Sequence, residues 1–205
     1  MEITQITKQK RGSRYNIFAD GRFVTGISEL ALAQRGWAAG DRLTTADLEG
    51  LADEDGYAKV LSKAYEYLAR RGHSVTELRQ KLVRKEYPTP VIEQVLGDLL
   101  ERGYLNDTQF AKDWVHSRNV SRGPALLRQE LRRKGIPNDV IASALDGSSE
   151  NELESASVIA RKKLRTMRGQ PWEVIYRRLT GYLNRRGFSY DTTRTVTETI
   201  KAELA

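Results

Sequence analysis

The sequence of 205 residues contains no cysteine, which excludes disulfide bonds, thiolate metal sites and a cysteine nucleophile. It also lacks any apolar run near the roughly 18 to 20 residues of a membrane span, and its first residues, MEITQITKQK, lack the apolar stretch of a secretory signal. It holds only two histidines, His73 and His116, which suit surface or capping roles, and no phosphate-cradling loop of the GxxxxGK type. We therefore expect a cytoplasmic protein with no membrane contact, no cofactor, no metal site and no catalytic residue.

Positive charge is in excess. The chain has 34 Lys and Arg against 27 Asp and Glu, with a net charge of +7 and a pI near 9.6. Residues 151–205 hold most of the surplus, with 11 basic and 6 acidic side chains. A surplus of this kind predicts an anionic partner, such as nucleic acid or an acidic protein surface, although a basic protein can also be merely soluble.

Residues 1–43 predict a small β unit. In RYNIFADGRFVTG, β-forming residues flank Asp20-Gly21, a pair that supplies the positive φ angles of a tight hairpin. Ile3 and Ile6 add a preceding strand, so we expect two or three strands. Ser28 then caps a short helix that Gly36 ends.

From Thr44 onward the apolar spacing becomes helical. We expect a linker helix over 44–56 and then a three-helix repeat over 57–105. Within this repeat, Ser74 and Glu77 have the spacing of a capping box at the start of the second helix. Thr89 is predicted to cap the third helix, with Pro90 at its first position.

The same order of helices returns twice, over 106–147 and 148–205. Asn106 or Asp107 is predicted to cap the first helix of the second repeat, and Asn138 to cap its third helix. Ser149 and Glu152 have capping-box spacing at the start of the last repeat. Units of about fifty residues are too small to bury their own cores alone, so the pattern predicts stacked helical repeats.

The middle helices of the three repeats align in one register. The matching segments are LRQKLVRKEYP at 78–88, LRQELRRKGIP at 127–137 and LTGYLNRRGFS at 179–189. The leucines at the first and fifth positions form the predicted core stripe, and Arg84 and Lys81 fall on or toward the solvent side. The basic pairs Arg84-Lys85, Arg133-Lys134 and Arg185-Arg186 recur in register, and we interpret them as a solvent-facing basic surface. Candidate contacts to an anionic partner are Arg79, Lys81, Arg84, Lys85, Arg128, Arg132, Arg133, Lys134, Arg177, Arg178, Arg185 and Arg186.

Other interpretations of these residues remain open. A basic face on a single helix is commonly only solvated, but packing does not explain why the pair recurs on three helices. Aromatic residues at helical spacing favour packing over base stacking; they are Tyr65, Tyr67, Trp114, Trp172, Tyr176 and Tyr182. No polar recognition face of Asn, Gln and Arg is evident, so sequence-specific base readout is not expected.

Several separated motifs also resemble one known family. YLARRGHSVTELRQKL, VLGDLLERGYLNDTQFAKDWVHSR, RGPALLRQELRRKGIP and LTGYLNRRGFSYDTTRTV occur in the order and spacing of the RecX family of bacterial recombination regulators. The resemblance covers residues 57 to about 200. Thr180 departs from the register, because the other repeats have Arg79 and Arg128 there.

The resemblance implies a mainly α fold, with three tandem three-helix repeats in an elongated, curved array and a small N-terminal β-hairpin extension. It also implies a non-enzymatic regulator of DNA repair, recombination and the SOS response. Such a protein binds the RecA filament, inhibits its ATPase, strand-exchange and co-protease activities, and binds single- and double-stranded DNA without sequence specificity.

We expect a monomer. The alternative is a general DNA-binding repeat protein that acts without RecA, and an unrecognised hydrolase is a distant third. Because solvent-face changes usually cost under about 0.5 kcal/mol, replacing Arg133 and Lys134 by Ala is predicted to weaken partner binding and hardly change melting.

Overall fold

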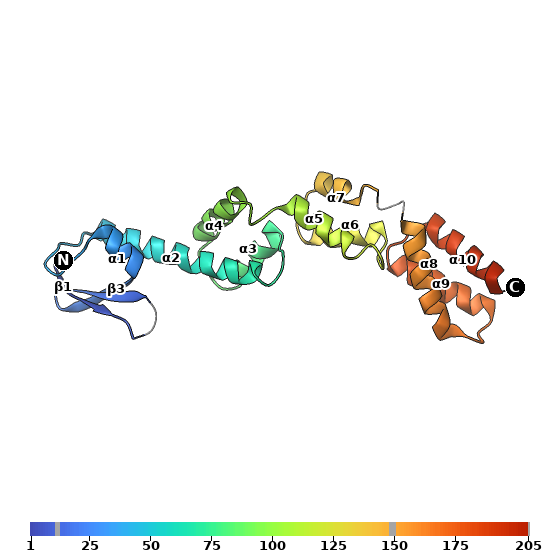
Figure 1. The fold of residues 1–205 in the computed structure, drawn as a ribbon, viewed down its shortest axis with the longest axis horizontal. Helices are drawn as coiled ribbons and strands as arrows, with labels where there is room; N and C mark the ends of the chain where they lie inside the picture. Colours follow the sequence, from blue (N-terminus) through green and yellow to red (C-terminus); the bar gives the residue numbers. More distant parts are fainter. Residues whose placement is uncertain (11–12, 148–150, 205) are drawn as a thin grey trace. The chain divides into compact units, whose positions relative to one another are not determined.

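The computed structural model describes residues 1–10, 13–147 and 151–204 and is mainly helical, as predicted (Figure 1). A three-stranded sheet comes first, and three successive groups of three helices follow, which confirms the predicted repeats. The first group comprises α2 (Thr45–Leu68), α3 (Val75–Val83) and α4 (Thr89–Glu101); the second α5 (Asp107–His116), α6 (Pro124–Arg133) and α7 (Asn138–Leu145); the third α8 (Glu152–Leu164), α9 (Trp172–Arg185) and α10 (Tyr190–Leu204).

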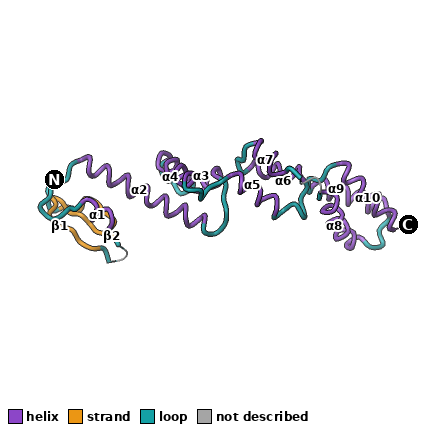
Figure 2. The backbone as a smooth tube through the Cα atoms, turned by 45° about the horizontal axis from the view of Figure 1, so that its top comes forward, coloured by secondary structure: helices purple, strands orange, loops and turns teal. Residues whose placement is uncertain are grey.

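The N-terminal strands form one antiparallel sheet in the order β1 (Ile3–Lys8), β2 (Arg14–Ala19), β3 (Arg22–Ser28) (Figure 2). Asp20 and Gly21 make the predicted turn between β2 and β3, with φ angles of 49° and 76°. Ser28 Oγ accepts a hydrogen bond from Ala31 N at 3.1 Å and caps α1 (Glu29–Arg35), and Gly36 ends that helix with a φ of 64°. These three sequence predictions are confirmed.

Helix α2 connects the sheet to the first repeat. Thr44 and Asp47 form a full capping box at its start, and the helix then runs unbroken for 24 residues. It therefore spans both the segment predicted as a linker helix and the start of the segment predicted as the first repeat. Beneath the sheet, Ile3, Ile17, Ile27, Leu43 and Leu51 form a buried cluster.

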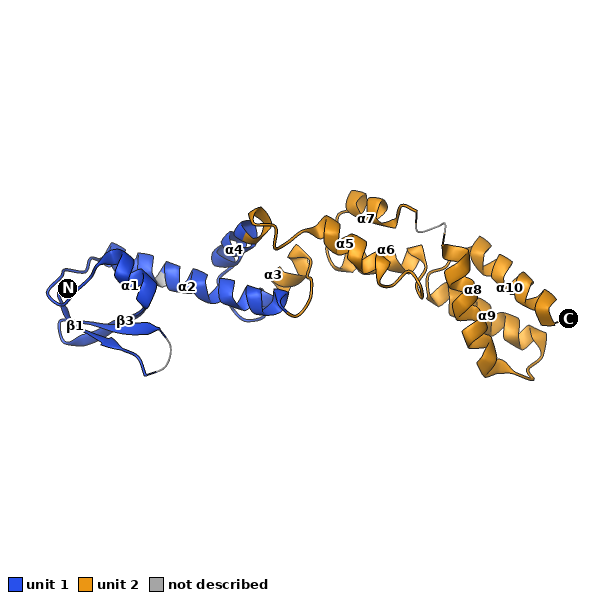
Figure 3. Cartoon of the chain, viewed as in Figure 1, with its two compact units in different colours: residues 1–69, 81–98 blue, residues 70–80, 99–205 orange. Residues whose placement is uncertain are grey.

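Contacts within the chain divide it into two compact units (Figure 3). The first comprises residues 1–69 and 81–98, and the second comprises residues 70–80 and 99–205. The division passes through α3 and α4. Residues 70–80, which hold the first turns of α3, therefore belong to the same unit as the second and third repeats.

The predicted leucine register is confirmed. Both core positions of every middle helix are fully buried, at 0% exposure: Leu78 and Leu82 in α3, Leu127 and Leu131 in α6, and Leu179 and Leu183 in α9. In the second repeat they pack in a cluster with Ile136 and Ile141, and in the third with Phe188 and Val196.

Helix starts differ from the predictions in detail. Asn106 caps α5 as predicted, accepting a hydrogen bond from Gln109 N at 2.9 Å. Helices α4 and α7 begin one residue earlier than predicted, because the carbonyls of Pro88 and Pro137 accept the first helical hydrogen bonds. Asn138 is thus inside α7, where its side chain accepts a hydrogen bond from Arg132 instead of capping. The predicted box at Ser149 lies outside the described residues.

Candidate interaction surface of the middle helices

The middle helices α3, α6 and α9 and the residues directly after their ends carry the candidate basic residues. Because their leucines face the core, most of these cations point away from it. Eight are exposed: Arg84, Lys85, Arg128, Arg132, Arg133, Arg177, Arg178 and Arg185. The other four, Arg79, Lys81, Lys134 and Arg186, are half-buried, and two of them hold neighbouring repeats together.

The start of α3 lies against the end of α6, and we call this contact the first joint. Ser74 Oγ donates a hydrogen bond to the carbonyl of Lys134 at 2.7 Å and also accepts one from Glu77 N at 3.1 Å. Gly135, with a φ of 76°, packs so closely that an added Cβ would lie 2.2 Å from Thr76 Oγ1. The start of one helix thus lies against the carbonyl end of another, an arrangement in which the opposite partial charges of the two helix ends attract.

Charged side chains close the first joint. Lys134 Nζ lies 3.2 Å from Glu77 Oε2, and Arg71 pairs with the same carboxylate. Burial alone would raise the pKa of Glu77, but hydrogen bonds and charge from Arg71 and Lys134 lower it to about 2. The carboxylate of Glu77 is therefore ionised at neutral pH.

Aromatic side chains support the same lysine. Lys134 Nζ lies 4.2 Å from the centre of the Trp114 ring and 5.7 Å from that of Phe110. Trp114 Nε1 donates to Glu130 at 2.9 Å, and the guanidinium of Arg118 lies 3.4 Å from the centre of the Trp114 ring. Trp114 is therefore occupied in packing, as predicted.

The start of α6 lies against the end of α9 in a second joint, at equivalent positions. Gly123 N donates to the carbonyl of Arg186 at 2.8 Å, and Ala125 N donates to that of Gly187 at 3.2 Å. An added Cβ on Gly187, whose φ is 81°, would lie 2.3 Å from Leu126 N. Arg186 Nη1 contributes one long hydrogen bond, at 3.4 Å, to the carbonyl of Ser121.

These joints correct the predicted solvent-side position of two cations. Lys134 and Arg186 are the second members of their basic pairs, and each is half-buried where the preceding repeat covers its helix end. Lys85, the equivalent residue just after α3, is exposed. The prediction of unchanged melting for a variant lacking Arg133 and Lys134 is therefore revised: Arg133 is a surface residue, whereas Lys134 is part of the first joint.

Other predicted residues are also partly covered. Lys81 Nζ lies 4.8 Å from the centre of the Tyr67 ring. Trp172 and Tyr182 pack against the core of the third repeat, as predicted, whereas Tyr176 is 47% exposed and has its ring centre 6.0 Å from that of Trp172. Of the surface or capping roles predicted for His73, the surface position is wrong, because the residue is buried; its Nδ1 lies 2.9 Å from the carbonyl of Arg71.

In the third repeat, three predicted arginines come together with a lysine that the helix register does not identify. Arg177, Arg178 and Arg185 of α9 line a concavity of about 390 Å³ with Lys163 of α8. Lys163 lies outside the aligned middle helices, so the register contains no signal for it. Only the packing of α8 beside α9 brings it there.

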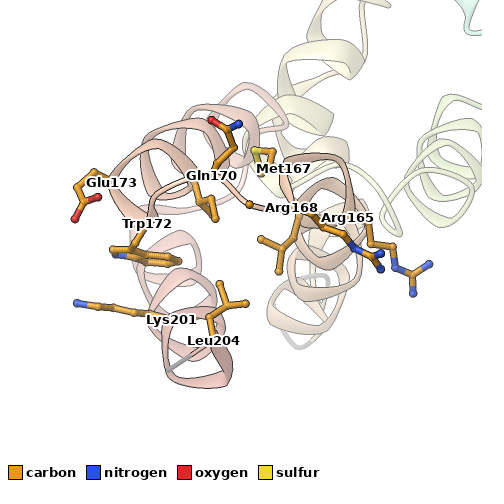
Figure 4. Close-up of a pocket in the computed structure, with 11 residues that line it drawn as sticks. Arg165, Met167, Arg168, Gln170, Trp172, Glu173, Lys201 and Leu204 are labelled. Carbon is orange, nitrogen blue, oxygen red and sulfur yellow. The ribbon is translucent and has the colours of Figure 1, made fainter.

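The third repeat also holds a pocket of about 760 Å³, with labelled side chains from α9, α10 and the 3-10 turn at Arg165–Met167 (Figure 4). Its lining is largely apolar, with Trp172, Met167 and Leu204, and it includes no Ser, Thr, Cys or His. This pocket therefore has no hydroxyl, thiol or imidazole for nucleophilic catalysis.

Two kinds of site are missing from the described part of the chain. No group of three or more His, Cys, Asp and Glu side chains lies in a position to hold a metal ion there. No helix among those residues has the length and apolar character needed to cross a bilayer.

Comparisons with known proteins match this arrangement. Models described as the first, second and third three-helix domains of RecX match residues 61–99, 106–145 and 150–197. Regulatory protein RecX of Leuconostoc mesenteroides is 29% identical over 205 residues, covering 98% of this chain and 77% of the relative. Regulatory protein RecX of Thermobifida fusca is 40% identical over 156 residues, covering 74% of this chain and 84% of the relative.

Solved structures give the same result. A crystal structure of regulatory protein RecX matches with a TM-score of 0.75 at 28% identity, over 96% of this chain and 98% of that one. The crystal structure of RecX from Lactobacillus salivarius matches with a TM-score of 0.64, over 73% of this chain and 99% of that one. At 21% identity, the second match bears on the fold alone.

Proposed function

Because this chain belongs to the RecX family of regulatory proteins, we propose that it acts as a monomer in the cytoplasm and binds the RecA filament. Binding lowers the ATPase, strand-exchange and co-protease activities of the filament and so regulates recombination, DNA repair and the SOS response. The chain acts by binding and carries out no covalent step.

One observation carries this proposal beyond family membership. The first member of each basic pair is exposed in the same register of three helices, at Arg84, Arg133 and Arg185. A filament presents the same surface at each protomer, so a series of equivalent cations suits a repeating acidic surface. The second members, Lys134 and Arg186, lie at the joints, where Lys134 pairs with Glu77 and the carbonyl of Arg186 accepts a hydrogen bond from Gly123 N.

The small free energy of each ion pair explains why binding needs several equivalent cations. An exposed ion pair contributes only about 0.2 to 1 kcal/mol, so a single arginine would bind weakly. Contacts on linked repeats act at a high effective concentration once the first has formed, and they add up without further translational cost. Joints with a fixed geometry also reduce the entropy lost on binding.

The test is DNA-dependent ATP hydrolysis by RecA with this protein at a substoichiometric ratio. We expect the wild-type chain to lower the rate. The double variant Arg84→Ala, Arg133→Ala should require about three- to tenfold more protein, which corresponds to the removal of two surface ion pairs.

The matched control is Arg102→Ala, Lys112→Ala, which removes two exposed cations outside the middle helices. This control should inhibit RecA as the wild type does. No effect of the wild-type chain on hydrolysis or on filament lifetime would contradict the proposal. Equal losses of inhibition in both double variants would show that total charge, and not the register, is recognised.

A second candidate function is general binding of single- and double-stranded DNA without RecA. It is favoured by the basic surplus of residues 151–205 and by the cations gathered on α8 and α9. For duplex DNA, the logarithm of affinity should fall with the logarithm of salt concentration by about 0.9 per phosphate bound. A flat salt dependence would exclude this function.

A further inference from the structure

The concavity between α8 and α9 has the shape of a small binding site. Its volume is about 390 Å³, and its lining residues are Lys163, Thr166, Met167, Arg177, Arg178, Gly181 and Arg185. Met167 is 3% exposed and belongs to the core of the third repeat, whereas the three arginines are exposed. The site therefore has an apolar base next to the core and cations at its opening.

A glycine on α9 opens this concavity. Gly181 occupies the position at which the first and second repeats have Gln80 and Gln129. Arg177 and Arg185 lie about one turn before and after it, on the same helix face. A Cβ on Gly181 would lie 3.2 Å from Arg185 Nη1, so a longer side chain would enter the space between the arginines.

The charge of this concavity is not compensated. Among the residues that the structure describes, no Asp or Glu forms an ion pair with Lys163, Arg177, Arg178 or Arg185. Lys163 Nζ is directed toward the Tyr182 ring, 6.0 Å from its centre. The four cations are therefore available to an external anion.

A second concavity provides the internal comparison. It also measures about 390 Å³ and is lined by Arg14, Lys59 and Lys63 beside α2. There, Asp55 pairs with Arg14 and Lys59, and Glu66 pairs with Lys63. Two basic concavities of equal size thus differ in whether the chain supplies its own carboxylates.

We propose that the concavity over Gly181, with Lys163, Arg177, Arg178 and Arg185, binds a phosphate group of a nucleic acid strand. Guanidinium groups donate paired hydrogen bonds to phosphate oxygens, and several cations around one space suit an anion with more than one charged oxygen. The exposed arginines leave the site open, so neighbouring nucleotides can continue along α9. This proposal rests on the DNA binding proposed above and assigns that binding to the third repeat.

The first experiment fills the site without changing its charge. Gly181→Gln restores the residue type of the other two repeats, and its Cβ meets only the flexible end of Arg185. Helicity should be kept, since glutamine favours a helix more than glycine does. The affinity for a fluorescent single-stranded oligonucleotide, measured by anisotropy without RecA, should fall about three- to tenfold, as expected when the protein binds about one phosphate fewer.

The matched control is Gly97→Gln, which makes the same exchange at an exposed helical glycine of α4 with open space around it. It should bind the oligonucleotide as the wild type does. A second variant, Arg177→Gln with Arg185→Gln, should lower affinity further and reduce the salt slope by about 0.7 for each phosphate that is no longer bound. Wild-type affinity in Gly181→Gln, or an unchanged slope in the arginine variant, would overturn the inference.

Two competitors identify the ligand. Inorganic pyrophosphate tests a free phosphate, and a poly-glutamate peptide of equal charge tests a chain of carboxylates. Displacement of the oligonucleotide by an excess of pyrophosphate but not by the peptide supports a phosphate site. Tighter binding of either competitor than of the oligonucleotide would overturn the assignment to nucleic acid.

Failure of this inference is distinct from failure of the proposed function. If Gly181→Gln binds DNA normally while the wild-type chain still inhibits RecA, only the phosphate site is wrong. If the wild-type chain leaves RecA unaffected, the regulatory proposal fails, and the oligonucleotide titration still decides the phosphate site.

Discussion

The first joint is held by charged and polar side chains, whereas the second is closed almost entirely by backbone atoms. In the first, Ser74 Oγ donates to the carbonyl of Lys134; in the second, the amide of Gly123 donates to the carbonyl of Arg186. These positions are equivalent in the register. The same meeting of helix ends is thus reached with two chemistries, so the position of the helix ends is what the repeats share.

The largest expected effect comes from adding a methyl group at the glycines of the joints. In Gly123→Ala, the new Cβ would lie 2.2 Å from the carbonyl oxygen of Gly187, which is backbone and cannot rotate away. We expect a loss of about 3 kcal/mol in the free energy of unfolding, measured by urea denaturation. Hydrogen exchange in the first turn of α6 should locate the loss.

The first joint should respond differently to the same change. In Gly135→Ala the obstacle is the side chain of Thr76, so the added variant Thr76→Gly should recover part of the stability. The single variant Thr76→Gly provides the control for its own cost, about 0.3 kcal/mol in helix propensity. If the double variant is no more stable than Gly135→Ala alone, backbone atoms also obstruct the added Cβ at the first joint.

Acidification should weaken the first joint and leave the second unchanged. The pKa of Glu77 is lowered from 4.5 to about 2, so its contribution is present above pH 4.5 and is lost as the pH falls toward 2. The loss amounts to at most about 3 kcal/mol. Asp107, which accepts a hydrogen bond from Val75 N, has a pKa raised by burial and changes stability in the opposite direction.

The variant Glu77→Gln isolates this contribution. The difference in unfolding free energy between wild type and variant should be largest near neutral pH and should shrink between pH 4.5 and 2. A difference that does not depend on pH would mean that the carboxylate is not the titrating group.

Removing the joint lysine should have a moderate effect. Lys134→Ala removes an ion pair and the cation's interactions with two aromatic rings, and we expect a cost of about 1 to 2 kcal/mol, because Glu77 keeps Arg71. The matched control is Lys85→Ala at the equivalent, exposed position just after α3, which should cost under about 0.5 kcal/mol. Equal melting temperatures for these two variants would contradict the role of Lys134 in the joint.

The smallest effect is expected at Glu86, the counterpart of Gly135 and Gly187. Glu86 is exposed and has a φ of 60°, a conformation that costs a residue with a side chain about 1 kcal/mol more than glycine. Glu86→Gly should therefore raise the melting temperature slightly, opposite in sign to Gly135→Ala. A lower melting temperature would mean that the side chain of Glu86 stabilises the fold.

Local signals in the sequence predicted local structure well. The leucine spacing identified the buried face of each middle helix, and Ser28, Asn106 and Asp20-Gly21 identified two caps and a turn, because each effect acts within a few residues. The predictions at Thr89 and Asn138 were one residue late, because the preceding prolines can serve as helix starts through their carbonyls.

Contacts between repeats could not be predicted from these local sequence patterns. A helical wheel places Lys85, Lys134 and Arg186 at equivalent angles, yet only the latter two are covered by the preceding repeat. The wheel describes one helix in water and contains no information on which helix end meets another. The same limit applies to Lys163, which joins the basic concavity only through the packing of two helices.

Glu86 also has a consequence for how many repeats can be strung together. Glycine at the end of α6 and of α9 leaves room for a preceding helix, whereas Glu86 places a charged side chain at the corresponding end of α3. A further repeat on the upstream side would have to cover this helix end, and the side chain of Glu86 would occupy the space that its middle helix needs. We therefore expect Glu86 to prevent an upstream extension of the same kind. Building a four-repeat protein from this chain would therefore begin with the exchange of Glu86 for glycine.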